Sequence, residues 1–402
     1  MRVNVGALMA LRADGAEDQF LFDEGLDDIW DVRRRFLRHP YATAYDKLGG
    51  GGFLQEENAP RCECPPESAR VSFAIPAGEG APADMVNELD LVLALDAEDP
   101  PIAALRLIRS VEVRCADRRI DGWEGTDVAT LIETMCAVFG RKLSRHGDRL
   151  FVPLALAPFH SHNLLSLVRS DASDASDASA ASDARPPDVV VTVEFVDAAS
   201  ASASAAELYG RTYFLSPKAR RRAALAYQMG SAYSQWGGDH PFPRSLSGMK
   251  HHLSFDHPVS MLMFWGVDKA TLTSVSLQLN GRAFYDGPLA PLERVKEQRG
   301  LGHVEPVVVF FSQDPPSSPF QSTVNFSRID SVTVVLRTRT RTHTTADMTD
   351  GGHPDPVVRY YAVSVHPLHV ADGTCSRVFE NGRVRDMFPE YGPTVSIEEA
   401  LG

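Results

Sequence analysis

The sequence predicts an all-β protein made of two β-sandwiches or jelly rolls in tandem. Short segments in which apolar residues alternate with polar or small ones recur along the 402 residues, and turn-forming residues separate them. These segments form two sets of similar kind, one in each half of the chain, and a few helical stretches interrupt each set. Many short strands with this spacing are typical of sandwiches and jelly rolls.

The composition is that of a globular protein with an acidic balance of charge. Hydrophobic residues make up 44% and charged residues 23% of the chain, which leaves ample material for a core. The 40 basic and 53 acidic residues give a net charge of −13. Because non-specific affinity for nucleic acid comes mainly from Lys and Arg on phosphates, we expect no direct contact with nucleic acid.

The five cysteines are few and scattered: Cys62, Cys64, Cys115, Cys136 and Cys375. An odd number in a long chain suggests reduced thiols in a cytosol-like compartment rather than a disulfide framework. Cys62 and Cys64 have no second pair beside them, and a structural zinc site needs four ligands, so we predict no zinc site.

The N-terminus and the hydropathy pattern predict a soluble protein that is made inside the cell. The apolar run after Met1 breaks into charge at Arg12 and Asp14, too soon for a signal peptide. The chain has no run of about 18 apolar residues, so no membrane-spanning helix is predicted.

The first half of the chain combines two helical segments with a series of strands. Residues 1–22 show helical spacing, with Leu8 and Leu11 among their apolar positions, and Leu131 and Met135 fall on one face of a second helix. Apolar residues predict strands at 71–75, 89–95, 105–113, 150–157 and 189–195.

Two tracts rich in Ala and Ser flank the strand at 189–195. Residues 170–184 are Asp-Ala-Ser repeats, and residues 198–206 are almost all Ala and Ser. Neither tract can bury enough apolar surface to offset the entropy lost on ordering. We therefore predict that both are mobile loops at the tip of a β-domain.

A helix and a second set of strands follow. Ser216 and Pro217 favour a helix start, because Ser is a good N-cap and Pro is preferred at the first helical position. We expect this helix to run to Trp236. Alternating apolar residues then predict strands around 253–255, 259–265, 275–279, 307–311, 332–336 and 361–365.

No motif points to an enzyme. The chain has no Gly-x-x-x-x-Gly-Lys phosphate loop, no Gly-x-Ser-x-Gly nucleophile elbow and no complete dinucleotide fingerprint. Histidines occur in three pairs without an acid cluster, so we predict no metal ligands, no catalytic residues and no cofactor-binding residues. The pairs are His160 with His162, His251 with His252, and His366 with His369.

One hexapeptide, just before the strand at 332–336, surrounds two apolar residues with polar ones. Taken by itself, it predicts a polar loop with two buried apolar side chains. It consists of Asn325, Phe326, Ser327, Arg328, Ile329 and Asp330. This order of residues resembles the C-terminal signature of the major capsid proteins of nucleocytoplasmic large DNA viruses, the double jelly-roll family.

Other segments resemble the same family, in the same order, over about residues 7–380. Residues 7–21 are similar to its opening helix, and residues 31–39 to the basic segment before its first jelly roll. The remaining matches are Ser110-Val111-Glu112, Ile120-Asp121, Val152-Pro153-Leu154, Phe255-Asp256-His257-Pro258-Val259 and Leu279-Asn280-Gly281. The chain departs from the family pattern at 155–159, at Cys115-Ala116 and at 319–323, which bears on surface loops and on the role within the particle.

The resemblance implies an all-β fold of two tandem eight-stranded jelly rolls, a double jelly roll, with short helical insertions and an N-terminal helix. Residues 1–25 are then the N-terminal helical segment, residues 26–207 the first jelly roll and residues 208–402 the second. Residues 325–330 become a structural signature of the second jelly roll. Asp330 is expected to pair with a basic group or with backbone N–H groups and so to fix the start of the following strand.

The resemblance also implies a structural protein and not an enzyme. Homotrimers form pseudo-hexameric capsomers that tile the icosahedral shell of a large double-stranded DNA virus. The implied partners are other copies of the chain, neighbouring capsomers, minor capsid and penton proteins, and the internal membrane through the N-terminal region, with no cofactor. The implied location is the virion capsid, after assembly in the host cytoplasm.

Two other functions stay open. A protein of the same fold can form a transient scaffold that lines a membrane during virion assembly. Carbohydrate-binding and enzymatic jelly rolls also share the architecture, since a fold alone does not fix function. A cupin-type enzyme needs a His/Glu metal set, and the sequence shows none.

Overall fold

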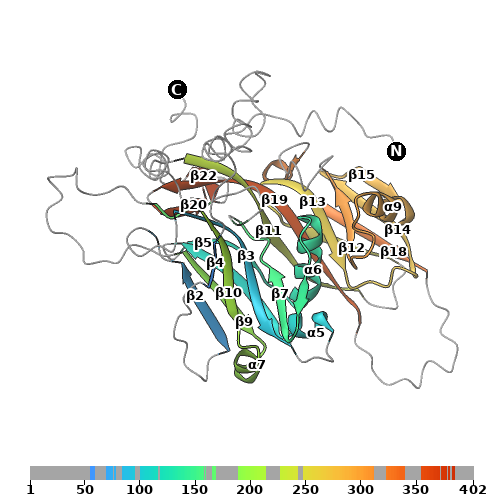
Figure 1. Ribbon diagram of the computed structural model, residues 1–402. Helices are drawn as coiled ribbons and strands as arrows, with labels where there is room; N and C mark the ends of the chain where they lie inside the picture. The colour runs from blue at the N-terminus through green and yellow to red at the C-terminus, as the bar shows by residue number, and fades with distance from the viewer. Residues whose placement is uncertain are drawn as a thin grey trace, which may run out of the picture. The chain divides into compact units, whose positions relative to one another are not determined.

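In a computed structural model, the chain divides into two compact units. Figure 1 shows their strands and helices. The first unit comprises Ala16–Ser234 and His366–Gly402, and the second comprises Met1–Gly15 and Gln235–Val365. The predicted N-terminal helix and the tract at 170–184 lie outside the described residues. The structure describes residues 55–58, 69–75, 77, 84–95, 100–115, 118–157, 159, 165–168, 189–213, 227–242, 248–311, 323–339, 355–371, 373–377, 379–380 and 383–384.

Two antiparallel sheets lie in the first unit. One has the order β1 (Gln55–Asn58), β10 (Glu207–Tyr213), β3 (Met85–Ala94), β7 (Arg149–Pro153) and β6 (Ser144–His146), and β8 (Leu165–Ser166) also pairs with β3. The other has the order β2 (Arg70–Ile75), β9 (Val189–Phe195), β4 (Ile108–Cys115) and β5 (Arg118–Trp123). Strands far apart in sequence, such as β2 and β9, are therefore direct neighbours.

The period-two pattern decides which side of each strand is buried. On β9, Val191 and Val193 are fully buried, whereas Thr192 between them is only partly so. The register places Phe73 of β2 opposite Val191, so buried residues of neighbouring strands share one face. The strands predicted at 71–75 and 189–195 are confirmed.

Helix α6 (Val128–Val138) covers the helical pattern found around Leu131 and Met135. Its N-cap is Asp127, whose side chain accepts a hydrogen bond from the N–H of Thr130 at 3.4 Å. The short helix α5 (Pro101–Leu105) corrects one boundary, because the strand predicted from residue 105 begins only at Ile108. In the described part of the chain, no helix is long and apolar enough to cross a membrane.

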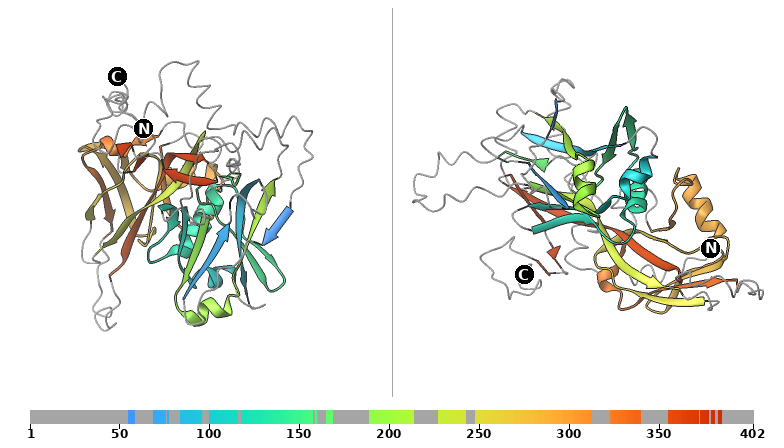
Figure 2. Two further views of the ribbon diagram at one scale, coloured as in Figure 1. Left: turned by 90° about the vertical axis from the view of Figure 1, so that its left-hand side faces the viewer. Right: turned by 90° about the horizontal axis from the view of Figure 1, so that it is seen from below.

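The loop predicted at 198–206 is wrong, because Ala198–Ala203 form helix α7. Ala has the highest helix propensity, and Asp197 accepts a hydrogen bond from the N–H of Ser200 at 2.6 Å. Ala201 is buried where α7 packs against β2 and β9, at one end of the strands in Figure 2. Tertiary contact thus orders a tract whose composition alone suggests disorder.

The second unit also holds two antiparallel sheets. One has the order β11 (Tyr227–Pro241), β19 (Val357–Ala371), β13 (Pro258–Trp265) and β16 (Val307–Phe310), and β17 (Val324–Asn325) pairs with β13. Strand β20 (Thr374–Arg377) pairs with the end of β19 and belongs to the first unit. The other has the order β12 (Gly248–Leu253), β18 (Val332–Thr338), β14 (Leu272–Leu279) and β15 (Arg282–Gly287). Strands β11 and β19 each cross the division between the units, at residues 234/235 and 365/366. A small hairpin of β21 (Phe379–Glu380) and β22 (Arg383–Val384) follows.

The second unit is built around β13, in which all eight residues are buried. Phe264 of β13, Leu277 of β14 and Val334 of β18 belong to one apolar core between the two sheets. Helix α9 (Ala290–Gln298) packs against β16 (Figure 2). The fully buried Lys296 of this helix donates hydrogen bonds to the carbonyl oxygens of Val304 and Pro306 at 2.9 and 3.0 Å, and so fastens the loop that follows the helix.

The predicted helix from Ser216 to Trp236 is wrong over residues 227–236, which form part of β11. Gly230 lies in this segment, and glycine disfavours a helix interior. Gly237 follows it in β11. A side chain at position 237 would collide with the ring of Phe255, because its Cβ would lie 2.5 Å from that ring. Residues 214–226 lie outside the described residues.

Candidate functional site

The hexapeptide at 325–330 connects the two sheets of the second unit. Asn325 ends β17, and the next three residues form a 3-10 turn, η2 (Phe326–Arg328), before β18 begins in the other sheet. The Asn325 Oδ1 atom accepts a hydrogen bond from the N–H of Ser327 at 3.0 Å. A short side-chain amide that bonds its own backbone favours a turn over continued strand, so Asn325 ends β17 at this point.

The backbone of His257 joins this turn to the start of β13. The His257 N–H donates to Ser327 Oγ at 2.7 Å, and the His257 carbonyl oxygen accepts from the N–H of Phe326 at 2.9 Å. His257 has a φ of 68°, in the left-handed region that non-glycine residues rarely adopt. Pro258 then pairs with Asn325 across β13 and β17. Two segments that resemble the capsid family thus form one junction.

Phe326 and Ile329 anchor the turn in the apolar core, as predicted. Phe326 is 1% exposed, and its ring centroid lies 5.5 Å from that of Phe311 and 6.3 Å from that of Phe255. Ile329 is 9% exposed. Rings at these separations add a specific geometry to the burial of apolar area, so they fix the position of the turn.

A third matching segment contacts the residue just after the hexapeptide. Asn280 and Gly281, with φ values of 48° and 73°, form the turn between β14 and β15. The Asn280 Oδ1 atom accepts from the N–H of Ser331 at 3.0 Å, and the Asn280 N–H donates to the Ser331 carbonyl oxygen at 2.8 Å. This two-way contact fixes the start of β18.

The expected role of Asp330 is wrong. Asp330 is exposed, and among the described residues its carboxylate forms no hydrogen bond and no ion pair. The bonds that fix this turn and the following strand come from Asn325, Ser327 and Asn280 instead. We name the contacts of residues 257, 280, 325–327 and 331 the turn junction.

His251 and His252 are consecutive residues of β12, so their side chains point to opposite faces of the sheet and do not bind a common metal ion. His251 is buried, and its Nδ1 atom lies 2.7 Å from the hydroxyl of Tyr360 in a hydrogen bond. Burial, together with the nearby His240, lowers the pKa of His251 to about 4, so its ring is neutral. His252 is exposed.

Nothing in the described residues forms a metal site. No group of three or more His, Cys, Asp or Glu side chains is placed to hold a metal ion within that part of the chain. His366 is buried edge-on against the ring of Tyr233, with centroids 5.7 Å apart, and His369 is half-buried on the same strand. His160 and His162 lie outside the described residues.

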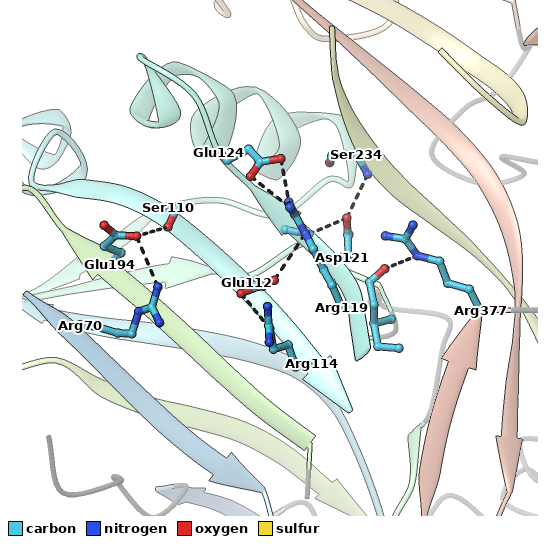
Figure 3. Close-up of polar contacts among 12 residues, drawn as sticks. Arg70, Ser110, Glu112, Arg114, Arg119, Asp121, Glu124, Glu194, Ser234 and Arg377 are labelled. Carbon is cyan, nitrogen blue, oxygen red and sulfur yellow. Dashed lines mark hydrogen bonds and ion pairs between the residues drawn. The ribbon is translucent and has the colours of Figure 1, made fainter. Parts of the chain in front are cut away.

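Asp121 forms a second polar junction, in the first unit (Figure 3). Asp121 is 1% exposed. Oδ1 accepts from the N–H of Gly122 at 2.8 Å and of Ser234 at 3.1 Å, and Oδ2 accepts from the N–H of Ala157 at 2.9 Å. One side chain therefore connects β5, the segment after β7, and β11.

Burial raises the pKa of Asp121 to about 6, although its hydrogen bonds and the positive charge of Arg377 act in the opposite direction. The Ile-Asp match in the sequence marked this residue without assigning it a role. An acidic residue between Ile120 and Trp123, both fully buried, is the signal that could have identified it. Buried carboxylates are rare unless their oxygens are paired.

Around Asp121, the exposed face of β4, β5 and β9 carries a row of ion pairs (Figure 3). Glu194 lies 3.9 Å from Arg70, and Arg119 lies 3.0 Å from Glu124 and 3.7 Å from Glu112. Exposed pairs of this kind typically contribute no more than about 1 kcal/mol each. They therefore contribute less to the fold than the bonds of Asp121.

The turn junction is built from backbone groups and the side chains of Asn325, Ser327 and Asn280, and the Asp121 junction from backbone groups and one buried carboxylate. Their polar atoms are taken up by bonds between strands and turns, which fixes the geometry of each unit. Such an arrangement suits a rigid building block more than the conversion of a substrate.

Comparison with solved structures identifies the fold. No family model matches the sequence, and no curated protein matches it either. PBCV-1 VP54, in a crystal structure fitted into a reconstruction of the virophage Sputnik, is similar with a TM-score of 0.61 and 15% identity, over 82% of this chain and 97% of VP54.

Two further structures agree. A quasi-atomic model of the PBCV-1 virus capsid gives a TM-score of 0.60 and 16% identity, with 82% of this chain and 97% of that chain covered. The Faustovirus major capsid protein gives 0.51 and 8%, over 89% of this chain and 100% of that one. The chain therefore has the double jelly-roll fold of viral major capsid proteins.

Proposed function

We propose that this chain is a viral major capsid protein, a structural component of the virion and not an enzyme. The likeness to PBCV-1 VP54 carries the proposal, because it spans 82% of this chain and 97% of VP54. A likeness that includes both β-rich units supports a shared architecture over nearly the whole of VP54, beyond a single jelly roll. The matches to the family in residues 110–154, 255–281 and 325–330 support the same function independently.

The internal organisation of each unit suits a shell protein. The fully buried strand β13 and the two polar junctions hold strands and turns in fixed positions. A tile that must meet identical neighbours at several edges needs such rigidity, since interfaces in symmetric assemblies depend on reproducible surfaces.

We further propose that three copies form a pseudo-hexameric capsomer and that capsomers tile an icosahedral shell around a large double-stranded DNA genome. Residues 26–207 and 208–402 are the two jelly rolls of this proposal, and residues 325–330 are a structural signature of the second. The N-terminal region, residues 1–25, faces minor capsid proteins or an internal membrane. Penton proteins and neighbouring capsomers complete the partners, and assembly takes place in the host cytoplasm.

Light scattering of the purified full-length protein tests the capsomer directly. The expected mass is about three times the 44.0 kDa of one chain, at micromolar concentration. Negative-stain images of the same fraction should show particles with a hexagonal outline. A monomer that stays monomeric as its concentration rises contradicts the proposal.

Quantification of the protein in purified virions separates a shell protein from a scaffold. A shell protein is among the most abundant chains of the mature particle, whereas a scaffold is present during assembly and lost afterwards. A stoichiometric content of zinc, iron or manganese in the purified protein would instead favour a cupin-type enzyme.

A further inference from the structure

Two buried cysteines from distant parts of the chain lie in contact in the first unit. Cys115 is the last residue of β4, and Cys375 lies in β20, 260 positions further along the chain. The N–H of Cys375 donates a hydrogen bond to the Sγ atom of Cys115 at 3.1 Å. The two residues are 1% and 3% exposed, and neither takes part in a disulfide.

Several contacts hold β20 in this position. Cys375 pairs with Val370 across β19 and β20, and β20 also packs against β4 and β5. The Nε atom of Arg377 donates to the carbonyl oxygen of Ile120 at 2.8 Å (Figure 3). Its guanidinium group lies over the ring of Tyr233, 4.5 Å from the centroid. Strand β20, which carries Cys375, is thus held in place by β19 and by its contacts with β4 and β5.

We propose that Cys115 and Cys375 are a disulfide-forming site, which covalently links β20 to β4 when the protein meets a low-molecular-weight disulfide. The nitrogen and the Cβ atom of a residue are bonded to the same Cα. An Sγ atom 3.1 Å from the Cys375 nitrogen is therefore within reach of the Cys375 side chain by side-chain rotation.

The reaction is a thiol–disulfide exchange in two steps. The thiolate of Cys375 attacks one sulfur of the small disulfide, forms a mixed disulfide and releases one small thiolate. The thiolate of Cys115 then attacks the Sγ atom of Cys375, forms the protein disulfide and releases the second small thiolate. The small disulfide is reduced by two electrons, and the two protons from the cysteines end on the two small thiols.

Burial of the cysteines limits the rate of this thiol–disulfide exchange. Burial, together with the neighbouring Cys115, raises the pKa of Cys375 well above its ordinary value, so the closed site holds a thiol and not the reactive thiolate. Exchange therefore requires β20 to open. The pair stays reduced during assembly in a cytosol-like compartment and oxidises slowly outside it. This timing rests on the proposed function, whereas the chemistry of the site does not.

The test uses the reduced full-length protein, incubated with oxidised glutathione and then mapped by mass spectrometry after the remaining thiols are alkylated. Before alkylation, we expect an intact mass lower by two hydrogen atoms than that of the reduced protein; after alkylation and digestion, we expect a peptide in which Cys115 is linked to Cys375. Added protease should cleave the segment that contains β20 about tenfold more slowly, because the disulfide keeps β20 from opening. Dithiothreitol should restore the original cleavage rate. Because trimer formation is measured separately, failure here leaves the capsomer proposal intact.

Two variants complete the experiment. Cys375→Ser removes the link and the protection, whereas Cys136→Ser is a matched control: Cys136 is also buried, donates through Sγ to the carbonyl oxygen of Pro153 at 3.2 Å, and takes no part in the pair. If Cys375→Ser does not fold, the wild-type peptide map still decides. The proposal is overturned if Cys115 and Cys375 both remain alkylated after oxidation, or if they carry glutathione or other cysteines instead of each other.

Discussion

The hydroxyl oxygen of Ser327 accepts a hydrogen bond from the backbone N–H of His257 at 2.7 Å, across 70 positions of the chain. The bond joins the turn before β18 to the start of β13, and so links the two sheets of the second unit where the chain passes between them. The left-handed backbone of His257, with a φ of 68°, is held in place by this contact and by the bond from the N–H of Phe326.

Replacement of Ser327 by Ala should destabilise the second unit. The His257 N–H is left without its acceptor in a partly buried position, and the loss of one such bond costs about 1–2 kcal/mol. We expect a lower melting temperature and a lower denaturant midpoint, measured by tryptophan fluorescence, because Trp265 on β13 is buried.

Asp330→Asn is the matched control for that variant, since Asp330 lies three residues away and is exposed. Its free energy of unfolding should differ from that of the wild type by less than about 0.5 kcal/mol. Equal losses in the two variants would show that the Ser327 contact is not the cause. A loss confined to Asp330→Asn would restore the pairing expected from the sequence.

A second pair of variants separates two contributions at Asn280. Asn280→Gly removes the bond to the N–H of Ser331 but suits the φ of 48°, whereas Asn280→Ala removes the bond and also strains the backbone. We expect both to lower the melting temperature, and Ala to be the less stable of the two by about 1 kcal/mol. Equal stabilities would mean that the left-handed conformation of this turn contributes nothing.

The sequence predicted these local features but not how they meet. Burial of Phe326 and Ile329 follows from their apolar character among polar neighbours, and the structure confirms it. The partner of Ser327 does not follow, because its contact with His257 depends on the pairing of β13 with β17. A charged residue such as Asp330 is the natural candidate for an anchoring role when partners are unknown, but the neutral Asn325 and Ser327 perform that role.

Contacts with strands that are distant in sequence also decide two elements that the sequence pattern mispredicts. The helix predicted to run to Trp236 fails over residues 227–236, which pair with β19 as part of strand β11. The Ala/Ser tract at 198–206 lacks apolar bulk, yet its small side chains fit against β2 and β9 as helix α7. Neither outcome can be read from a window of neighbouring residues, because the deciding contacts come from other strands.

Asp121 should make the stability of the first unit depend on pH. Its pKa is about 6 in the folded protein and close to 3.8 in the unfolded chain, so the folded state favours the protonated form. Its contribution is therefore fully present below about pH 4 and is lost as the pH rises through about 6, by about 3 kcal/mol in all.

Asp121→Asn, which cannot ionise, tests this dependence. Asn keeps one acceptor oxygen but presents an N–H₂ group towards the N–H of Ala157 in place of Oδ2, so the variant should be less stable than the wild type at pH 4. The difference between their melting temperatures should shift in favour of the variant between pH 4 and pH 7. A difference that stays constant over this range would show that Asp121 does not titrate there.

His251 should give a pH dependence of the opposite sign in the second unit. Its pKa is about 4 when folded against an ordinary value of 6.5, because burial and His240 disfavour the charged ring. The unfolded chain therefore binds a proton first, and the stabilisation that is present above pH 6.5 is lost as the pH falls towards 4.

In a double variant, His251→Phe with Tyr360→Phe, the shared hydrogen bond disappears without leaving an unpaired partner, and the acid-induced fall of the melting temperature should become shallower. His252→Gln, on the exposed face of the same strand, should leave the fall unchanged; an equally shallow profile in that variant would assign the effect to surface charge instead of to the buried ring.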